Sequence, residues 1–397
     1  MLDLSRVLAG PWASQLLGDY GADIIKVERP GSGDDTRHWG PPWLHDAAGQ
    51  RTGESAYFLS ANRNKRSITV DLANPSGPKV VRELAARSDV LLENFRVGTL
   101  ARYGLDWPAL SKLCPALVYC SISAYGQTGP RAAEAGYDAM MQASAGLMSI
   151  TGEPDEQGGA PQKVGVAISD IMAGMYAATA ILAALRSRER TGRGQHIDVP
   201  LYDSQVAWLA NQAMNYLVSG EAPRRLGTAH PNIVPYQAFE TSDGFIMLAV
   251  GNDRQFLACT HCLGCPELGE DSRYTTNAQR VENRSALIAI LAERFRRRAT
   301  SEWLELMRQH GIPAGPINDL AAVFSGGQAR DAQLVRQLPH PAVGMVPVVA
   351  NPVRFSETPV EYRSAPPLLG EHTVEILRED LGYSEAQIAA LQDSGAV

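Results

Sequence analysis

The chain lacks an excess of positive charge: its 397 residues include 36 Lys and Arg against 43 Asp and Glu, for a net charge of −7. A general nucleic-acid or membrane-surface binder needs a basic surface, so these two classes of protein are excluded. Residues 1–4 show no basic segment leading into an apolar one, and hence no signal peptide. No apolar run approaches the ~20 residues of a membrane span. We therefore expect a cytoplasmic protein without nucleic-acid or membrane partners.

The sequence has only five cysteines, and three of them are clustered at Cys259, Cys262 and Cys265. This spacing is typical of part of an iron–sulfur motif, but a fourth cysteine at a useful distance is missing. Apolar residues such as Phe256 surround the cluster, and buried thiols behave as small hydrophobic groups. We expect packing residues here, and no metal.

The N-terminal half alternates short apolar runs with helical patterns. The runs predict strands at 2–5, 23–28, 67–72, 89–93 and 117–122, with helices at 11–20 and 78–87. Such alternation is typical of a parallel sheet covered by helices on both faces, so we predict a Rossmann-like α/β fold. The first strand–helix turn carries Leu8-Ala9-Gly10-Pro11 in place of Gly-x-Gly-x-x-Gly, which argues against a nicotinamide dinucleotide.

The length exceeds that of one typical domain, and the composition changes around residues 220–235. Two short strands follow at 236–240 and 245–250, joined by a hairpin turn at 242–244, and amphipathic helices run from about 280 to 309. We predict a large Rossmann-like domain at 1–224, a small α+β domain at 225–318, and a C-terminal segment at 319–397 that returns to the large domain.

Asp170 is the strongest candidate for chemistry. It follows an apolar segment and precedes a helical pattern rich in small residues, where Ser169 and Asp170 are good N-cap types. A carboxylate at a helix N-terminus is stabilised by the free N–H groups and the macrodipole, so we expect it to stay ionised, as a nucleophile must. The alternative is an ordinary capping aspartate, which on position alone is the more common case.

Around Asp170 and along most of the chain, the sequence resembles class III CoA-transferases, the formyl-CoA transferase and CaiB/BaiF family. The matching segments, in order, are Leu8–Pro11, Gly18–Asp23, Lys26–Asp34, Asn64–Ser67, Glu93–Phe95, Gly126–Pro130, Gly136–Asp138, Gly311–Pro316 and Leu369–Thr373. No single segment is decisive, but their joint order is highly specific.

The resemblance implies an enzyme that moves CoA from an acyl-CoA to a free carboxylic acid, with coenzyme A as substrate and product. Asp170 is then the catalytic nucleophile, which forms a mixed anhydride and afterwards an aspartyl-CoA thioester. The family also implies an interlocked homodimer, with active sites between the large domain of one subunit and the small domain of its partner.

Residues for CoA binding carry over by position. They are Leu8 and Ala9 in the first turn, Arg29 near the phosphates, Val70, Asp71, Leu72 and Ala73 beside the adenine, Asn94, Phe95 and Arg96 beside the pantetheine, Arg102 after that loop, and Tyr137 with Asp138 at the thioester. The simpler interpretation of Arg29 is a surface ion pair with Glu28 or Asp34.

Two departures from formyl-CoA transferase bear on the substrate. Arg6 and Leu8 stand where that enzyme has histidine and glutamine, and its glycine-rich tetrad has no counterpart, so we do not expect formyl-CoA or oxalate. The loop at 224–237 resembles the branch that uses succinyl-CoA with dicarboxylic acids, and Arg225 and His230 are candidates to bind the distal carboxylate. A solvated interdomain loop is the alternative.

Two other functions fit the same fold. α-Methylacyl-CoA racemase has Gly-His-Asp where this chain has Gly136-Tyr137-Asp138, and tyrosine, with a pKa near ~10, is a poor base at neutral pH. A non-catalytic CoA-binding protein, with Asp170 a mere helix cap, is the second alternative.

Overall fold

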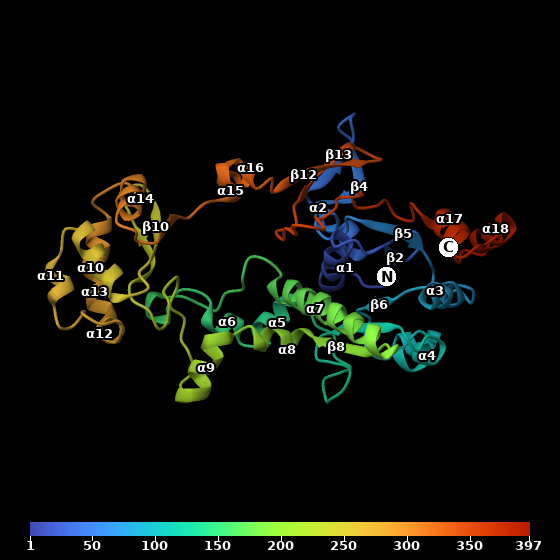
Figure 1. Cartoon of the computed structure of the whole chain (residues 1–397), viewed down its shortest axis with the longest axis horizontal. Helices are drawn as coiled ribbons and strands as arrows, with labels where there is room; N and C mark the ends of the chain where they lie inside the picture. The colour runs from blue at the N-terminus through green and yellow to red at the C-terminus, as the bar shows by residue number, and fades with distance from the viewer. The chain divides into compact units, whose positions relative to one another are not determined.

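The computed structural model describes all 397 residues, which form two compact units. The first unit comprises residues 1–147, 164–218 and 327–397, and the second comprises 148–163 and 219–326 (Figure 1). The division predicted from sequence placed residues 148–163 in the large domain, whereas they belong to the second compact unit here. The three predicted segments themselves stay a prediction about folding domains.

The first unit is built on a parallel sheet of six strands. In chain order these are β1 (Leu2–Asp3), β2 (Ile24–Glu28), β5 (Lys65–Thr69), β6 (Val90–Glu93), β7 (Val118–Ser123) and β8 (His196–Pro200). Their spatial order is β5-β2-β1-β6-β7-β8, and every neighbouring pair is parallel. This is the Rossmann order, with the topological switch point between β1 and β6. The predicted parallel α/β sheet is confirmed.

One predicted strand is displaced. We expected a strand at 67–72, but β5 ends at Thr69, and residues 70–73 form a loop beyond its carboxyl end. The apolar residues Val70 and Leu72 suggested a longer strand. Val70 instead packs in the core after the strand has ended.

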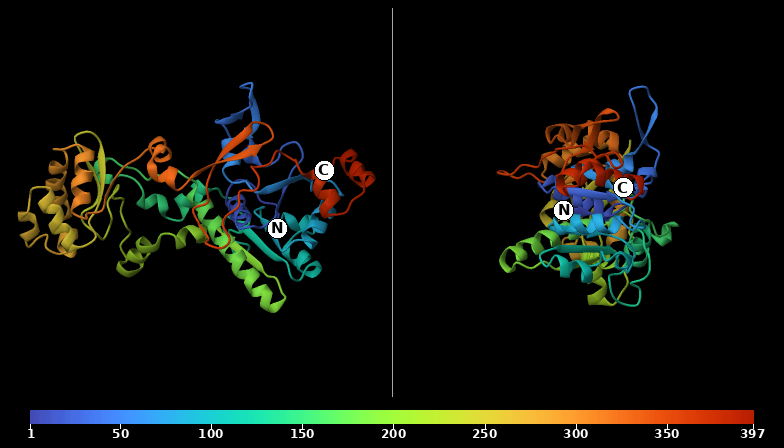
Figure 2. Two further views of the ribbon diagram at one scale, coloured as in Figure 1. Left: turned by 45° about the horizontal axis from the view of Figure 1, so that its top comes forward. Right: turned by 90° about the vertical axis from the view of Figure 1, so that its right-hand side faces the viewer.

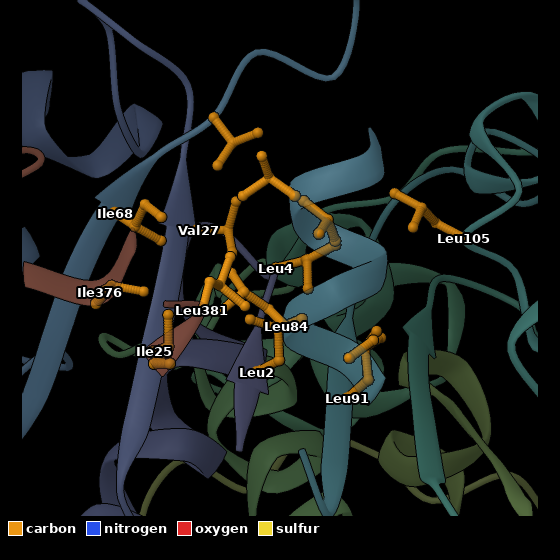
Figure 3. Close-up of a cluster of buried hydrophobic side chains, with 14 of the residues drawn as sticks. Leu2, Leu4, Ile25, Val27, Ile68, Leu84, Leu91, Leu105, Ile376 and Leu381 are labelled. Atoms are coloured by element: carbon orange, nitrogen blue, oxygen red, sulfur yellow. The ribbon is translucent and has the colours of Figure 1, made fainter. Parts of the chain in front are cut away.

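Helices cover both faces of the sheet, as the alternation of side chains along each strand requires. Leu91 and Tyr119 point into one core with α3 (Gly77–Ala86), α4 (Trp107–Leu113) and α18 (Glu385–Asp393). Figure 3 shows this cluster, in which Ile376 and Leu381 from the C-terminal segment join Leu2, Ile25 and Leu91. Leu92 and Cys120 point into the other core, formed with α1 (Ala9–Asp19) and α7 (Ile168–Thr191).

Helix α7 is long and apolar, with 24 residues and a mean hydropathy of 1.6 over its most apolar stretch. The expectation that no segment reaches the length of a membrane span is therefore wrong for this helix. Within the fold, however, α7 is a core helix that packs against α1: a Cβ on Gly174 would lie 2.6 Å from the Ala9 carbonyl oxygen. In Figure 2, α7 is the long green helix of the first unit.

The second unit has an antiparallel sheet in the order β11-β10-β9, formed by β9 (Tyr236–Glu240), β10 (Phe245–Ala249) and β11 (Ala314–Pro316). The predicted hairpin is confirmed by the pairing of Phe245 with Glu240. The sheet packs against α10 (Asp253–Cys262), α12 (Asn277–Glu282), α13 (Arg284–Phe295) and α14 (Thr300–Gln309). Cys259 and Cys265 are fully buried in this core, where burial raises the pKa of both thiols.

The remaining elements are short. They are the 3₁₀ segments η1 (Asp35–His38), η2 (Leu100–Tyr103) and η3 (Asp155–Gln157), the strands β3 (Trp43–His45), β4 (Arg51–Ser55), β12 (Val335–His340) and β13 (Gly344–Val349), the helices α2 (Ala56–Leu59), α5 (Asp138–Ser144), α6 (Leu147–Ile150), α8 (Leu201–Ala207), α9 (Ala210–Ser219), α11 (Glu267–Glu270), α15 (Leu320–Ser325), α16 (Gly327–Asp331) and α17 (Thr373–Glu375), and the π-helical segment Ile376–Asp380.

Candidate active site

The carboxyl ends of β1 and β6 meet at the switch point of the sheet, where open α/β folds bind their ligands. A cavity of about 230 Å³ opens there. Its lining comes from the turn after β1, the loop after β6, the end of β7 and the start of α7. Among the residues proposed from sequence, it is lined by Leu8, Ala9, Asn94, Phe95, Arg96, Tyr137 and Asp170.

Asp170 is the third residue of α7 and is nine-tenths buried. The expectation that Ser169 or Asp170 caps this helix is wrong, because the helix begins at Ile168 and its N-cap is Ala167. The capping group comes from a different helix: Asp138 on α5 accepts a hydrogen bond of 2.7 Å from the Ser169 N–H. Asp170 makes no capping bond and is left facing the cavity.

Asp138 is itself held in place. Its second carboxylate oxygen accepts a hydrogen bond of 2.7 Å from Gln142, one turn later on α5. On the other side of Ser169, the serine hydroxyl donates to Gln205 on α8 at 2.8 Å. The start of α7, and with it Asp170, is therefore fixed by side chains from two neighbouring helices.

The expectation that Asp170 stays fully ionised is also wrong. Burial, and secondly the nearby Asp138 carboxylate, raise the pKa of Asp170 to about 7. The positive end of the helix dipole favours the charged form, but the loss of water around the carboxylate outweighs it. Near neutral pH the Asp170 carboxyl group is thus close to half-protonated.

A second cavity, of about 380 Å³, is lined by Arg29 and by Val70, Asp71, Leu72 and Ala73. Arg6, Asp35 and Phe95 line both cavities, so the two are adjoining parts of one groove. Arg29 is exposed and makes no ion pair, since Glu28 instead binds Arg37 and Asp34 binds Lys26. The groove joins a buried carboxylate at one end to a free cation at the other, an arrangement that fits a long ligand with an anionic end.

Arg102 and Asp138 do not line these cavities. Arg102 is exposed on η2, and Asp138 acts through the N-terminus of α7 as described above. Their role as direct CoA contacts stays a prediction.

The two candidates for the acid substrate, Arg225 and His230, lie in the second unit. Arg225 is ion-paired with Asp155 and also donates to the Glu153 carbonyl at 3.2 Å. The His230 Nδ1 accepts a hydrogen bond from the Asn232 N–H at 3.1 Å. Burial and the Arg284 guanidinium lower the pKa of His230, so this side chain is mostly neutral at pH 7. The loop is therefore less cationic than its sequence indicates.

Tyr57 on α2 is a residue that the sequence did not reveal. Burial raises its pKa to about 12, and the carboxylates of Asp170, Asp138 and Asp34 add to that shift. Its ring packs edge-on against Trp39, with centroids 5.2 Å apart. No motif surrounds Tyr57, and only the folding of α2 brings it near α7.

Comparison with known proteins supports a specific family. The sequence profile of CoA-transferase family III matches residues 1–373. The mouse protein succinyl-CoA:glutarate CoA-transferase is 48% identical over 397 residues, which are 100% of this chain and 89% of the mouse protein. The succinate–glutarate CoA-transferase of Agrobacterium fabrum is 47% identical, over 96% of this chain and 94% of that protein. Among solved structures, a CAIB/BAIF family protein from Brucella suis superposes with a TM-score of 0.83 at 48% identity, covering 95% of this chain and 97% of that one.

Proposed function

Since the chain belongs to CoA-transferase family III, we propose that it transfers CoA from succinyl-CoA to a dicarboxylic acid of the size of glutarate, with Asp170 as the nucleophile. The observation that carries this proposal is the position of Asp170: it is buried, makes no capping bond, and lines a cavity at the switch point of a Rossmann sheet. The proposed dicarboxylate rests on the similarity to the two glutarate enzymes.

The proposed reaction has four steps. The Asp170 carboxylate attacks the thioester carbonyl, the C–S bond breaks, and a mixed anhydride and CoA thiolate result. The thiolate then attacks the Asp170 carbonyl carbon and releases succinate, which leaves an aspartyl-CoA thioester. The acceptor carboxylate attacks that thioester, expels the thiolate and forms a new anhydride. Finally the thiolate attacks the acceptor's acyl carbon, so that the new acyl-CoA forms and Asp170 is again a carboxylate.

The groove suits the parts of this ligand. We propose that the thioester end lies beside Asp170 and Tyr137, and that the nucleotide end lies beside Arg29 and the loop at 70–73. Arg29 is an unpaired cation available to a phosphate. Burial of Asp170 also restricts the access of water to the anhydride, which water would otherwise hydrolyse.

Incubation of the protein with succinyl-CoA and a panel of acids tests the function, with new acyl-CoA measured by chromatography. We expect glutarate to outperform butyrate as acceptor, and succinyl-CoA to outperform formyl-CoA as donor. Equal rates with formyl-CoA and oxalate contradict the proposed branch. Deuterium exchange at the acyl α-carbon without CoA transfer supports a racemase, and CoA binding without either reaction supports the non-catalytic alternative.

We further propose that the active form is a homodimer, as the resemblance implies. Sedimentation velocity tests it, since a stable monomer with full activity contradicts it. The cytoplasmic location and the lack of a metal requirement stay predictions from sequence.

A further inference from the structure

The turn between β1 and α1 contains a strained residue. Val7 has a φ of 72°, in the left-handed region that a β-branched side chain rarely adopts. Val7 lines the cavity that holds Asp170, and the preceding Arg6 lines both cavities. A strained conformation persists only where its surroundings hold it, so the groups around this turn are of interest.

Two buried side chains hold the turn from within the fold. The Lys26 ammonium donates to the Ser5 carbonyl at 2.9 Å, and the two Asp34 carboxylate oxygens accept from the Val7 N–H at 3.1 and 3.2 Å. Lys26 and Asp34 also form an ion pair at 2.9 Å, and neither side chain is exposed. The two ends of the turn are thus fixed to one buried ion pair.

A third side chain holds the middle of the turn. Asn94, on the loop after β6, accepts from the Arg6 N–H at 2.9 Å and donates to the Arg6 carbonyl at 2.7 Å. Four consecutive backbone groups, from Ser5 to Val7, therefore have side-chain partners. Because these partners follow β2 and β6 or lie within β2, the turn is tied to the strands on both sides of β1.

Asp34 is the group on which the others converge. Besides Val7 and Lys26, it accepts hydrogen bonds from the Thr36 N–H at 3.0 Å and the Thr36 hydroxyl at 2.8 Å. Burial by itself raises the pKa of Asp34, but Lys26 and Thr36 hold it below its ordinary value, so the carboxylate is ionised. A charged acceptor binds an amide more strongly than a neutral one does.

We propose that Asp34 is a positioning residue for the CoA groove: it holds Val7 in the left-handed conformation that gives the turn at 5–7 its shape. Without Asp34, Val7 relaxes to an ordinary φ and the wall shared by the two cavities moves. The inference rests on the proposed function only in naming CoA as the ligand.

The first experiment measures CoA binding to Asp34→Ala by calorimetry, together with kcat and KM for succinyl-CoA. We expect the Kd for CoA and the KM to rise about tenfold, the equivalent of one charged hydrogen bond, while kcat changes less because Asp170 stays in place. Asp19→Ala is the matched control. Asp19 is an equally buried carboxylate, paired with Arg63 at 2.5 Å; it lines neither cavity, whereas Asp34 lines the second one. The control should lose stability and keep its affinity for CoA.

A second experiment removes the strain. Glycine adopts positive φ without the clash of a Cβ, so Asp34→Ala should cost much less CoA affinity in a Val7→Gly background than in the native background. We expect the tenfold loss to shrink to about threefold or less. A loss of equal size in both backgrounds, or native CoA affinity in Asp34→Ala, overturns the proposal.

A third measurement keeps the proposal testable if Asp34→Ala does not fold. At a position with negative φ, Val→Gly destabilises more than Val→Ala, and at a strained positive φ this order reverses. Val7→Gly should therefore unfold at a higher temperature than Val7→Ala, and the opposite order contradicts the strain at Val7. The outcomes for CoA affinity and for stability do not depend on catalysis: a wild-type protein that binds CoA without transferring it refutes the proposed function and leaves this inference standing.

Discussion

As the proposed nucleophile, Asp170 has to satisfy two opposing requirements, because its burial would protect a reactive anhydride and at the same time disfavours the carboxylate that would form it. With a pKa of about 7, the ionised fraction of Asp170 rises with pH through neutrality. We expect kcat/KM for succinyl-CoA to rise about tenfold per pH unit below ~6.5 and to level off above ~8.

Asp138→Asn is the informative variant for this profile. It retains an oxygen that can accept from the Ser169 N–H, but it removes the second cause of the raised pKa of Asp170. The midpoint of the profile should therefore move to lower pH. A profile that is flat between pH 6 and 8 in the native enzyme contradicts the assignment of Asp170 as a half-protonated nucleophile.

Replacement of Asp170 by Asn should abolish acyl transfer, because an amide cannot form the anhydride or the thioester. CoA binding should persist, since the rest of the groove is unchanged. Hydroxylamine or borohydride trapping, followed by mass spectrometry, should place an acyl adduct on the peptide that contains Asp170 in the native enzyme. Substantial turnover in Asp170→Asn without a trappable adduct excludes the mechanism.

Stability gives a second measurement on the same variant. The folded-state pKa of Asp170, about 7, lies above the ordinary 3.8, so the stability due to this group is fully present below about pH 4 and is lost as pH rises through 7. At pH 8, Asp170→Asn should therefore unfold at a higher urea concentration than the native protein. Its free energy of unfolding should be larger by about 1–4 kcal/mol. A capping aspartate predicts the reverse, a loss of about 0.5–2 kcal/mol in Asp170→Ala.

At this scale the order of the surrounding motifs makes Asp170 the candidate nucleophile, but the sequence does not predict its protonation state. Burial depends on the packing of elements around the start of α7, and the second cause, Asp138, lies on α5, which α6 and η3 separate from α7 along the chain. Tyr57 is missed for the same reason, because a lone tyrosine on a four-residue helix has no pattern that points to a site.

At the scale of elements, the contact between α1 and α7 positions both the first turn and Asp170. Gly174 permits this contact, since a Cβ there would lie 2.6 Å from the Ala9 carbonyl oxygen and 3.3 Å from Trp12. Gly174→Ala should force the helices apart, cost about 1–3 kcal/mol of stability and lower activity, because Ala9 and Asp170 line the same cavity.

Gly327→Ala is the control for this variant. Gly327 also lies in a helix, but a Cβ there meets nothing within 4 Å, so alanine should be neutral or stabilising by up to ~1 kcal/mol. Chemical denaturation of both variants, alongside the transfer assay, tests the prediction. Equal stability in the two variants contradicts a tight helix contact at Gly174.

Elements whose own side chains specify them are predicted well from sequence. Strands β2, β6 and β7 match their apolar runs to within a residue or two, and the β9–β10 hairpin matches its turn. The start of α7 is mispredicted because its capping group, Asp138, comes from another helix. The strand predicted at 67–72 is too long at its C-terminal end, because the apolar residues at 70 and 72 pack against the core beyond the end of β5.

At the scale of the whole molecule, the alternation of strands and helices predicts the parallel sheet, and the sheet then determines where the groove lies, at the switch point between β1 and β6. Sequence does not reveal how much of the first unit's centre is ionic. Asp3, Lys26, Asp34 and Lys65 are all fully buried there, and Arg37 bridges Glu28 and Glu54 beside them.

This buried network predicts how stability depends on pH. Burial opposes the charged forms of Asp3, Glu28 and Asp34, yet Lys65, Arg37 and Lys26 respectively hold the three pKa values below their ordinary range. Burial also lowers the pKa of Lys65 to about 7, so Lys65 is fully charged only below neutral pH. Their stabilising effect is therefore present above about pH 4 and is lost as pH falls through the lowered values.

Asp170 and Glu93 have the opposite effect, because their pKa values are raised to about 7. Their protonation makes the folded protein more stable as pH falls from 7 to 4. Urea unfolding should thus show stability rising from pH 7 to about 5 and falling steeply below pH 4. Salt screens buried ion pairs poorly, so we expect the loss of stability below pH 4 to persist in 1 M salt. If 1 M salt abolishes this loss, its cause is repulsion between surface charges and not the buried network.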